Sequence, residues 1–192
     1  MRLGAFQLQE GCDALFSKWL EGGSVRILGI DTGLANLGWA VIEGGKQVSR
    51  LISSGVVTTT PRMALAERLW RIETALDEII SNNKPDLMAY EELFFNPKRP
   101  SMMKTNLSVG IVMCAGWKHG LSPRGFRPQD AKHLLTRSPA ASKEDVARSV
   151  VLYLGSDKQV KHGDHATDAM AHALCYFSAF KLDFLEKISG PK

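Results

Sequence analysis

The chain has 192 residues, of which 44% are hydrophobic and 23% are charged, a composition typical of one soluble globular domain. Its formal charge of +4 and its isoelectric point near 9.0 permit a polyanionic partner without establishing one. The apolar runs are too short to span a bilayer, and polar residues interrupt any signal-peptide core near the amino terminus. Cys12, Cys114 and Cys175 lack CxxC spacing, so we expect packed thiols in a reducing compartment and a cytoplasmic protein.

Residues 1–24 stand apart from the rest of the sequence. Apolar residues at helical spacing run over Asp13–Leu20, and the EGGS sequence of Glu21–Ser24 is typical of a linker. The composition is compatible with a docking helix, a cloning remnant or upstream sequence included by a wrong start choice. We interpret the extension as a non-catalytic appendage to a domain over 25–192, and we expect a chain that starts at Ser24 to fold and to act.

Three strands are predicted at the start of this domain. The first, Val25–Asp31, is rich in β-branched residues and is followed by a tight turn at Thr32–Gly33. A second apolar run covers Gly38–Ile42, and the Gly44–Gly45 turn precedes a third strand over Val48–Thr58. Strands joined by tight turns favour an antiparallel meander.

A helix and a short strand follow. Thr60–Pro61 is typical of a cap with proline at the first helical position, and apolar residues at helical spacing continue to Asn82–Asn83. Leu87–Tyr90 reads as a short buried strand that leads into Glu91–Glu92. The basic, proline-rich segment Asn96–Pro100 is too broken for regular structure.

The remaining residues alternate helices with one strand. We predict a helix over Asn106–Lys118, a short strand over Leu121–Phe126, and a helix opened by the capping box at Ser142–Asp145. The alanine-rich stretch Asp164–Phe180 predicts a final helix. This order of elements indicates an α/β fold in which a mixed five-stranded sheet is flanked by helices.

Acidic and imidazole side chains lie where these elements end. Asp31 closes the first strand and Glu91 closes the fourth, while His165 and Asp168 share one face of the final helix with Asp164. Sites rich in carboxylates select Mg²⁺ or Mn²⁺. Two such ions about 3.5–4 Å apart would activate a water and stabilise the leaving oxygen in phosphodiester cleavage. Acids at element ends are also common as caps, so the spacing alone leaves both interpretations open.

Three segments resemble the acidic motifs of the RuvC-type Holliday junction resolvases, a family of the RNase H-like superfamily. They are GIDTGLANLGWAVI from Gly29, AYEELFF from Ala89 and HGDHATDAMAHAL from His162. The resemblance covers the chain from Val25 to Phe180, and the motifs occur in the order of the family at compatible separations. It implies an RNase H-like fold. The first motif alone is weak, because sugar kinases and actin-like ATPases open with a similar phosphate turn.

The resemblance also implies a set of site residues. The catalytic set is Asp31, Glu91, His165, Asp168, Lys132 and Lys143. The first four would be the metal ligands, with Asp164 as the fallback for His165 if the helix begins one turn later. Either lysine could stabilise charge that develops in phosphoryl transfer, although a solvated lysine at a helix end is the ordinary alternative.

Contacts to DNA and between subunits are implied in the same way. Phe94 corresponds to the aromatic residue that the family places against unpaired bases, whereas Phe94 or Phe95 could equally belong to the core. The residues that we expect to contact phosphates are Lys98, Arg99, Lys104, Arg124 and Arg127. The helices after the third and fourth strands would form the dimer surface, to which Trp70 and Met113 could contribute.

We therefore expect a homodimeric endonuclease that resolves Holliday junctions by paired nicking, with two Mg²⁺ per active site and Mn²⁺ as a substitute. Its partner would be four-way or other branched DNA, with no membrane partner and with room for branch-migration machinery. The alternatives are an inactive RNase H-like scaffold that binds nucleic acid, or a phage-type endonuclease of broad specificity for branched and flap DNA. An actin-like ATPase or sugar kinase is disfavoured, because these proteins bind nucleotide between two related halves and this chain has room for one.

Overall fold

The computed structural model describes residues 12–45, 49–92, 101–155 and 164–189, with the backbone alone described at 12, 101–105 and 186–189. Its strands are β1 (Val25–Asp31), β2 (Asn36–Gly44), β3 (Ser49–Thr58), β4 (Leu87–Glu91) and β5 (Pro123–Phe126). Its helices are α1 (Cys12–Leu20), α2 (Leu65–Asn83), α3 (Ser101–Lys118), α4 (Pro128–Thr136), α5 (Lys143–Leu154) and α6 (His165–Ser189). In this part of the chain no helix combines the length and the apolarity that crossing a membrane requires.

The five strands form one mixed sheet in the order β3-β2-β1-β4-β5, which confirms the expected fold class. β1 pairs antiparallel with β2, and β2 pairs antiparallel with β3, as the tight turns predicted. β4 lies parallel to β1 and β5 lies parallel to β4. Because β1 and β4 run the same way side by side, their carboxyl ends meet at one edge of the sheet, where Asp31 and Glu91 stand.

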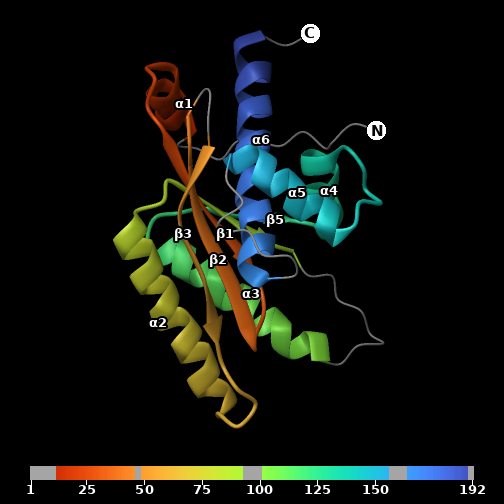
Figure 1. Cartoon of the computed structure of the whole chain (residues 1–192). Coiled ribbons are helices and arrows are strands. Elements are labelled where there is room, and N and C mark those ends of the chain that lie inside the picture. The colour runs from red at the N-terminus through yellow and green to blue at the C-terminus, as the bar shows by residue number, and fades with distance from the viewer. Residues whose placement is uncertain (1–11, 46–48, 93–100, 156–163, 190–192) are drawn as a thin grey trace.

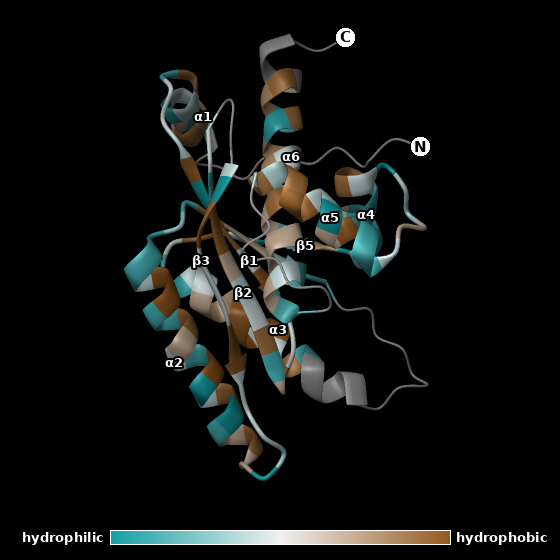
Figure 2. Cartoon of the chain, viewed as in Figure 1, coloured by the Kyte–Doolittle hydropathy of each residue, from teal (hydrophilic) through white to brown (hydrophobic). Residues whose placement is uncertain are grey.

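Helices cover both faces of the sheet (Figure 1). On one face α6 lies across β1 and β2 with α4 and α5 beside it, and on the other face α2 and α3 pack together. The hydrophobic side of α2 faces the sheet and its charged side faces outward (Figure 2). α6 approaches β1 so closely that a Cβ on Gly29 would lie 2.1 Å from the backbone oxygen of Ala169. Glycine at position 29 is therefore what lets α6 lie directly on the sheet.

The amino-terminal helix is part of this packed body. Phe16 and Trp19 are 4% and 8% exposed and belong to the same core as α6. The Phe16 ring lies 4.6 Å from that of Phe180, and the Trp19 ring lies 5.1 Å from that of Phe184. Apolar burial of this extent stabilises a fold, so α1 contributes to the core of the domain, and the ability of a chain starting at Ser24 to fold and to act stays a prediction.

Several boundaries differ from those that the sequence predicted. α2 begins at Leu65 rather than Pro61, because the residues after Thr60 first form a turn in which the Met63 amide donates to the Thr60 carbonyl. α3 begins at Ser101 instead of Asn106, and β5 begins at Pro123 instead of Leu121. α6 continues nine residues past Phe180 to Ser189.

α4 was not predicted at all. It opens with Pro128 and a capping box formed by Arg127 and Asp130. The expected packed thiols divide into two cases, since Cys175 is buried in α6 whereas Cys114 is exposed on α3. Burial raises the pKa of the Cys175 thiol, so this residue is an inert part of the core.

Candidate active site

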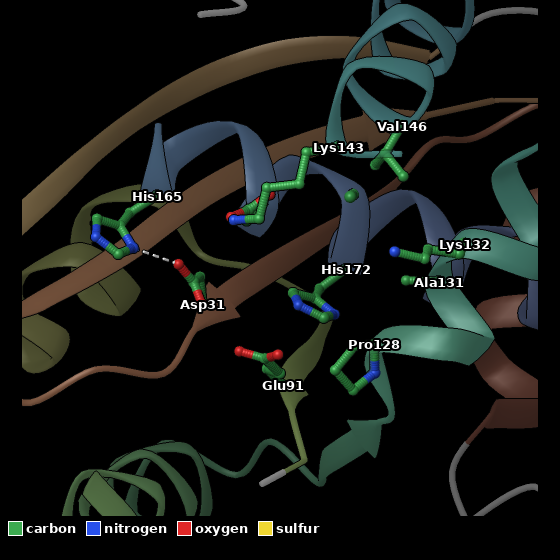
Figure 3. A pocket seen from close by; sticks show the side chains of 11 residues that line it. Asp31, Glu91, Pro128, Ala131, Lys132, Lys143, Val146, His165 and His172 are labelled. Carbon is green, nitrogen blue, oxygen red and sulfur yellow. Dashed lines mark hydrogen bonds and ion pairs between the residues drawn. The ribbon is translucent and has the colours of Figure 1, made fainter. Parts of the chain in front are cut away.

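A cavity of about 200 Å³ opens at the edge of the sheet where β1 and β4 end (Figure 3). Three helices complete its wall: α4, α5 and α6. The residues that line it are Asp31, Glu91, Pro128, Ala131, Lys132, Lys143, Val146, His165, Asp168, Ala171 and His172. All six residues of the expected catalytic set are therefore brought together from five separate elements.

The strand ends and α6 are held in place by short-range contacts. The Thr32 hydroxyl donates to the carbonyl of Glu91 at 3.1 Å and so ties the end of β1 to the end of β4. A Cβ on Gly38 would lie 2.1 Å from the backbone oxygen of His165, so the first turn of α6 rests directly on β2. These contacts place His165 and Asp168 above the carboxylate of Asp31.

Asp31 and Asp168 each have a nitrogen partner. Nδ1 of His165 lies 2.6 Å from Oδ2 of Asp31, which is 8% exposed. Nζ of Lys143 donates to Oδ2 of Asp168 at 2.9 Å, and this hydrogen bond together with the charge of Asp168 raises the pKa of Lys143. Lys143 is the first residue of α5, where the Ser142 cap fixes the helix start and directs the lysine toward α6.

The carboxyl group of Glu91 has a strongly shifted pKa. Burial, then the hydrogen bond and charge of Asp31 and the charge of Asp168, raise its pKa to about 8, while Lys143 opposes the shift. A carboxyl group in this position is costly to ionise, because two further acids face it and the nearby cations do not compensate them. A perturbed acid in a cleft is a common mark of a functional site.

The donor set suits a hard divalent cation. Three carboxylates and two imidazoles line one cavity, and burial together with the charges of Asp31 and Asp168 raises the pKa of Glu91, so that a cation would stabilise its ionised form. In the part of the chain described here, no three His, Cys, Asp or Glu side chains stand close enough together to hold one ion as they are. Asp31 is paired with His165 and Asp168 with Lys143.

Asp164 does not line the cavity, whereas His172 does. Asp164 precedes α6, accepts from the amide of Ala166 at 3.3 Å and does not line the cavity, so it caps the helix instead of entering the site. His172 lines the cavity although sequence reasoning passed over it. The signal was its spacing, one turn after Asp168 and two turns after His165. Burial lowers the pKa of His172.

Most of the expected DNA contacts lie outside the described residues. This holds for Phe94, Phe95, Lys98 and Arg99, and for the side chain of Lys104. Arg127 is exposed at the start of α4, where Nε lies 2.9 Å from Asp130.

Arg124, which the resemblance suggested as a phosphate contact, is largely buried against α6. It points to the same side of β5 as Phe126, its side chain is 17% exposed, and its guanidinium lies 3.4 Å from Asp183 of α6. The guanidinium also stacks on Phe126 and Tyr176. Arg124 therefore joins β5 to α6 and is not positioned for phosphate contact.

The two residues suggested for the dimer surface are exposed. Trp70 on α2 is 61% exposed and Met113 on α3 is 46% exposed, so neither belongs to the core. Trp117 on α3 is 73% exposed and lines a shallow hollow with Met113 and Cys114. Large apolar side chains gathered on one surface mark an interaction site.

Comparison with known proteins agrees with this geometry. The family model of crossover junction endodeoxyribonuclease RuvC matches residues 27–176. The RuvC protein of Alkaliphilus metalliredigens (strain QYMF) is 32% identical over 162 residues, which are 84% of this chain and 98% of that protein. The structure of Thermus thermophilus RuvC has a TM-score of 0.74 and 31% identity, over 82% of this chain and 96% of that chain.

The structure of T. thermophilus RuvC in complex with a Holliday junction substrate has a TM-score of 0.73 and 29% identity, over the same shares of the two chains. The matched residues include all of the sheet except the first two residues of β1, and the three acids of the cavity, Asp31, Glu91 and Asp168. This chain belongs to the RuvC family of crossover junction endodeoxyribonucleases.

Proposed function

We propose that this chain resolves four-way DNA junctions as a homodimer, in which each subunit hydrolyses one phosphodiester bond. The observation that carries the proposal is the convergence of Asp31, Glu91 and Asp168, from three distant segments, on one cavity that also holds two lysines. A scaffold that only bound DNA would gain nothing from acids that repel one another, and burial together with the charges of Asp31 and Asp168 raises the pKa of Glu91.

Nucleases of the RuvC family use divalent metal ions, and we assign two Mg²⁺ to each site, with Mn²⁺ as a substitute. Asp31, Glu91, Asp168 and His165 would hold them, because hard cations prefer carboxylate oxygens. Bound there, the ions would polarise the scissile phosphodiester and the attacking water and would stabilise the leaving oxygen.

The lysines and the apolar wall have separate roles. Lys132 and Lys143 line the cavity from α4 and α5, where an ammonium group can neutralise charge that develops on the phosphate. Pro128, Ala131 and Val146 exclude water from the same wall, which strengthens each electrostatic interaction inside. Lys143→Ala should therefore slow single-turnover cleavage more than it weakens junction affinity; an equal loss in both would mean that Lys143 only binds DNA.

The dimer would use the exposed side chains of α2 and α3. Trp70, Met113 and Trp117 are large, apolar and exposed, which is the composition of the centre of a protein interface. A two-fold axis through this face would place two identical sites on one junction and so allow two symmetric cuts. Sedimentation of the unaltered chain and of Trp117→Asp would test it, with loss of the dimer expected in the variant.

For DNA binding we keep Phe94 as the side chain that stacks on unpaired bases, and Lys98, Arg99, Lys104 and Arg127 as phosphate contacts. Arg127 is exposed near the cavity, at the start of α4. Branch-migration machinery bound to the same DNA junction would be a further partner of this chain.

The decisive experiment incubates the purified chain with four-way, flap and linear duplex DNA, with and without Mg²⁺. We expect Mg²⁺-dependent cleavage of the four-way junction, and loss of cleavage with retained binding in Asp31→Asn. The matched control is Asp164→Asn, because Asn is an equally good helix cap and Asp164 lies outside the cavity.

Three other outcomes have distinct meanings. Binding without cleavage in the unaltered chain would support the inactive scaffold, and equal cleavage of flap and four-way DNA would support the phage-type endonuclease. Loss of cleavage in Asp164→Asn as complete as in Asp31→Asn would make Asp164 the fourth ligand in place of His165.

A further inference from the structure

His172 is the one imidazole of the cavity that has no role in the function proposed above. It lies on α6 and is 4% exposed. Its Nδ1 is buried and makes no hydrogen bond to any described residue. A buried polar atom without a partner destabilises a fold, so its position next to a reactive cavity calls for a physical reason.

The position of His172 is set by the same helix that carries two of the expected ligands. His165, Asp168 and His172 are spaced by three and then four residues, so all three side chains leave α6 on one side. Figure 3 shows the ring of His172 near the carboxylate of Glu91 and the ring of Pro128, with which it lines the cavity. The imidazole thus lies close enough to the acids for the charges of Asp31 and Asp168 to act on it.

The surroundings would accept an apolar side chain. Pro128, Ala131, Val146 and Ala171 form the rest of this wall and offer the imidazole no hydrogen-bonding group of their own side chains. A leucine or phenylalanine would fill the space without leaving a nitrogen unpaired. The advantage of histidine over an apolar residue at position 172 must therefore come from a hydrogen bond to a group that enters the cavity.

We propose that His172 is a positioning residue that hydrogen-bonds, through its unpaired ring nitrogen, to a water in the shell of a divalent ion held by Asp31, Glu91 and Asp168. This inference rests on the metal site of the proposed function. Groups that hydrogen-bond to the ligands of an ion orient those ligands, and their loss weakens ion binding by about 10–100-fold. His172 thereby raises the affinity of the site without being a ligand itself.

The test compares two substitutions of nearly equal shape. His172→Asn keeps a polar atom near the position of Nδ1, whereas His172→Leu replaces it with a methyl group. Each metal-free full-length chain is titrated calorimetrically with MgCl₂ and, separately, with MnCl₂. We expect His172→Leu to bind both ions at least about 10-fold more weakly and His172→Asn to bind them nearly as tightly as the unaltered chain.

A second measurement separates this role from a structural one. Because His172→Leu removes an unpaired buried nitrogen, the metal-free variant should unfold at a urea concentration equal to or above that of the unaltered chain. A residue that only filled the core would show the reverse, with lower stability and unchanged ion affinity. If His172→Leu fails to fold, His172→Phe supplies an apolar ring of nearly the original size for the same titration.

His133→Leu is the matched control, since His133 is an exposed imidazole on α4 outside the cavity. Equal ion affinity in the unaltered chain, His172→Leu and His172→Asn would overturn the role of His172 while leaving the metal site intact. If the unaltered chain bound neither ion, the metal site of the proposed function would fall, and the role of His172 with it.

Discussion

Removing the aromatic contact between α1 and α6 should destabilise the whole domain. Phe16 is 4% exposed, and its ring packs against Phe180, which is fully buried, at a centroid distance of 4.6 Å. Truncating a buried phenylalanine to alanine typically costs 3–5 kcal/mol, so we expect Phe16→Ala to lower the free energy of unfolding by about 3 kcal/mol. Domains of this kind are stable by roughly 5–15 kcal/mol, so this loss is a large fraction of the total.

The assay is equilibrium unfolding in urea, followed by far-ultraviolet circular dichroism. Leu20→Ala is the control, because Leu20 lies on the same helix and is 50% exposed; it should change stability by less than about 1 kcal/mol. The double variant with Phe180→Ala should show a coupling of about 0.5–1.5 kcal/mol, as expected for rings in contact. A chain that starts at Ser24 should lose at least as much stability as Phe16→Ala.

The result that refutes this reasoning is equally clear. If Phe16→Ala were no less stable than Leu20→Ala, or if the shortened chain unfolded at the same urea concentration as the full chain, α1 would be an appendage after all. The packing of Phe16 and Trp19 on α6 would then have no energetic consequence. Cleavage by the shortened chain at low temperature would not decide the matter, because a destabilised enzyme can still be folded there.

Three further outcomes follow from particular contacts. The raised pKa of Glu91 means that the folded state holds its proton more tightly than the unfolded chain, so the stability of the metal-free protein should fall as the pH rises from 4.5 toward about 8. Glu91→Gln in the presence of EDTA should therefore raise the free energy of unfolding by roughly 1–3 kcal/mol at pH 8 and have little effect at pH 5, and equal effects at both would contradict the assignment. Arg124→Ala should lower the free energy of unfolding by about 2–4 kcal/mol and leave the slope of log DNA affinity against log salt concentration unchanged. Arg127→Ala should reduce that slope by about 1 and leave the free energy of unfolding unchanged. Gly29→Ala should lower stability by roughly 1–3 kcal/mol and abolish cleavage, because its Cβ would meet the backbone of α6, whereas Gly45→Ala, with open space around it, should change neither.

The sheet and the three acids were predictable because local patterns carry them. The β-branched run before Asp31 and the short apolar run before Glu91 each identify a strand and its end. Once both strands are placed in one mixed sheet, parallel neighbours put those ends side by side. The position of Asp168 could be predicted from the alanine-rich helix that carries it and from its spacing of three residues from His165.

Other features depend on contacts between distant segments, which no local pattern shows. The spacing of apolar residues in α1 predicted an amphipathic helix. It did not show that this helix packs against Phe180 and Phe184 of α6. β5 has four residues, too few for alternation to show that Arg124 faces α6 together with Phe126. His172 on an alanine-rich helix resembles an ordinary core histidine until Glu91 and α4 are placed around it.

The fold explains how the acids of the site are held in position. Acids drawn together by the sheet would repel one another, yet Asp31 is held by His165 and Asp168 by Lys143. Each of these partners stands at the first residue of a helix, α6 and α5, whose position on the sheet is set by backbone contacts and caps rather than by the acids. The carboxylates of Asp31 and Asp168 therefore keep their orientation through these nitrogen partners. Glu91 hydrogen-bonds to Asp31 and, among the described residues, has no comparable nitrogen partner, and its raised pKa identifies it as the group whose ionisation the cation must stabilise.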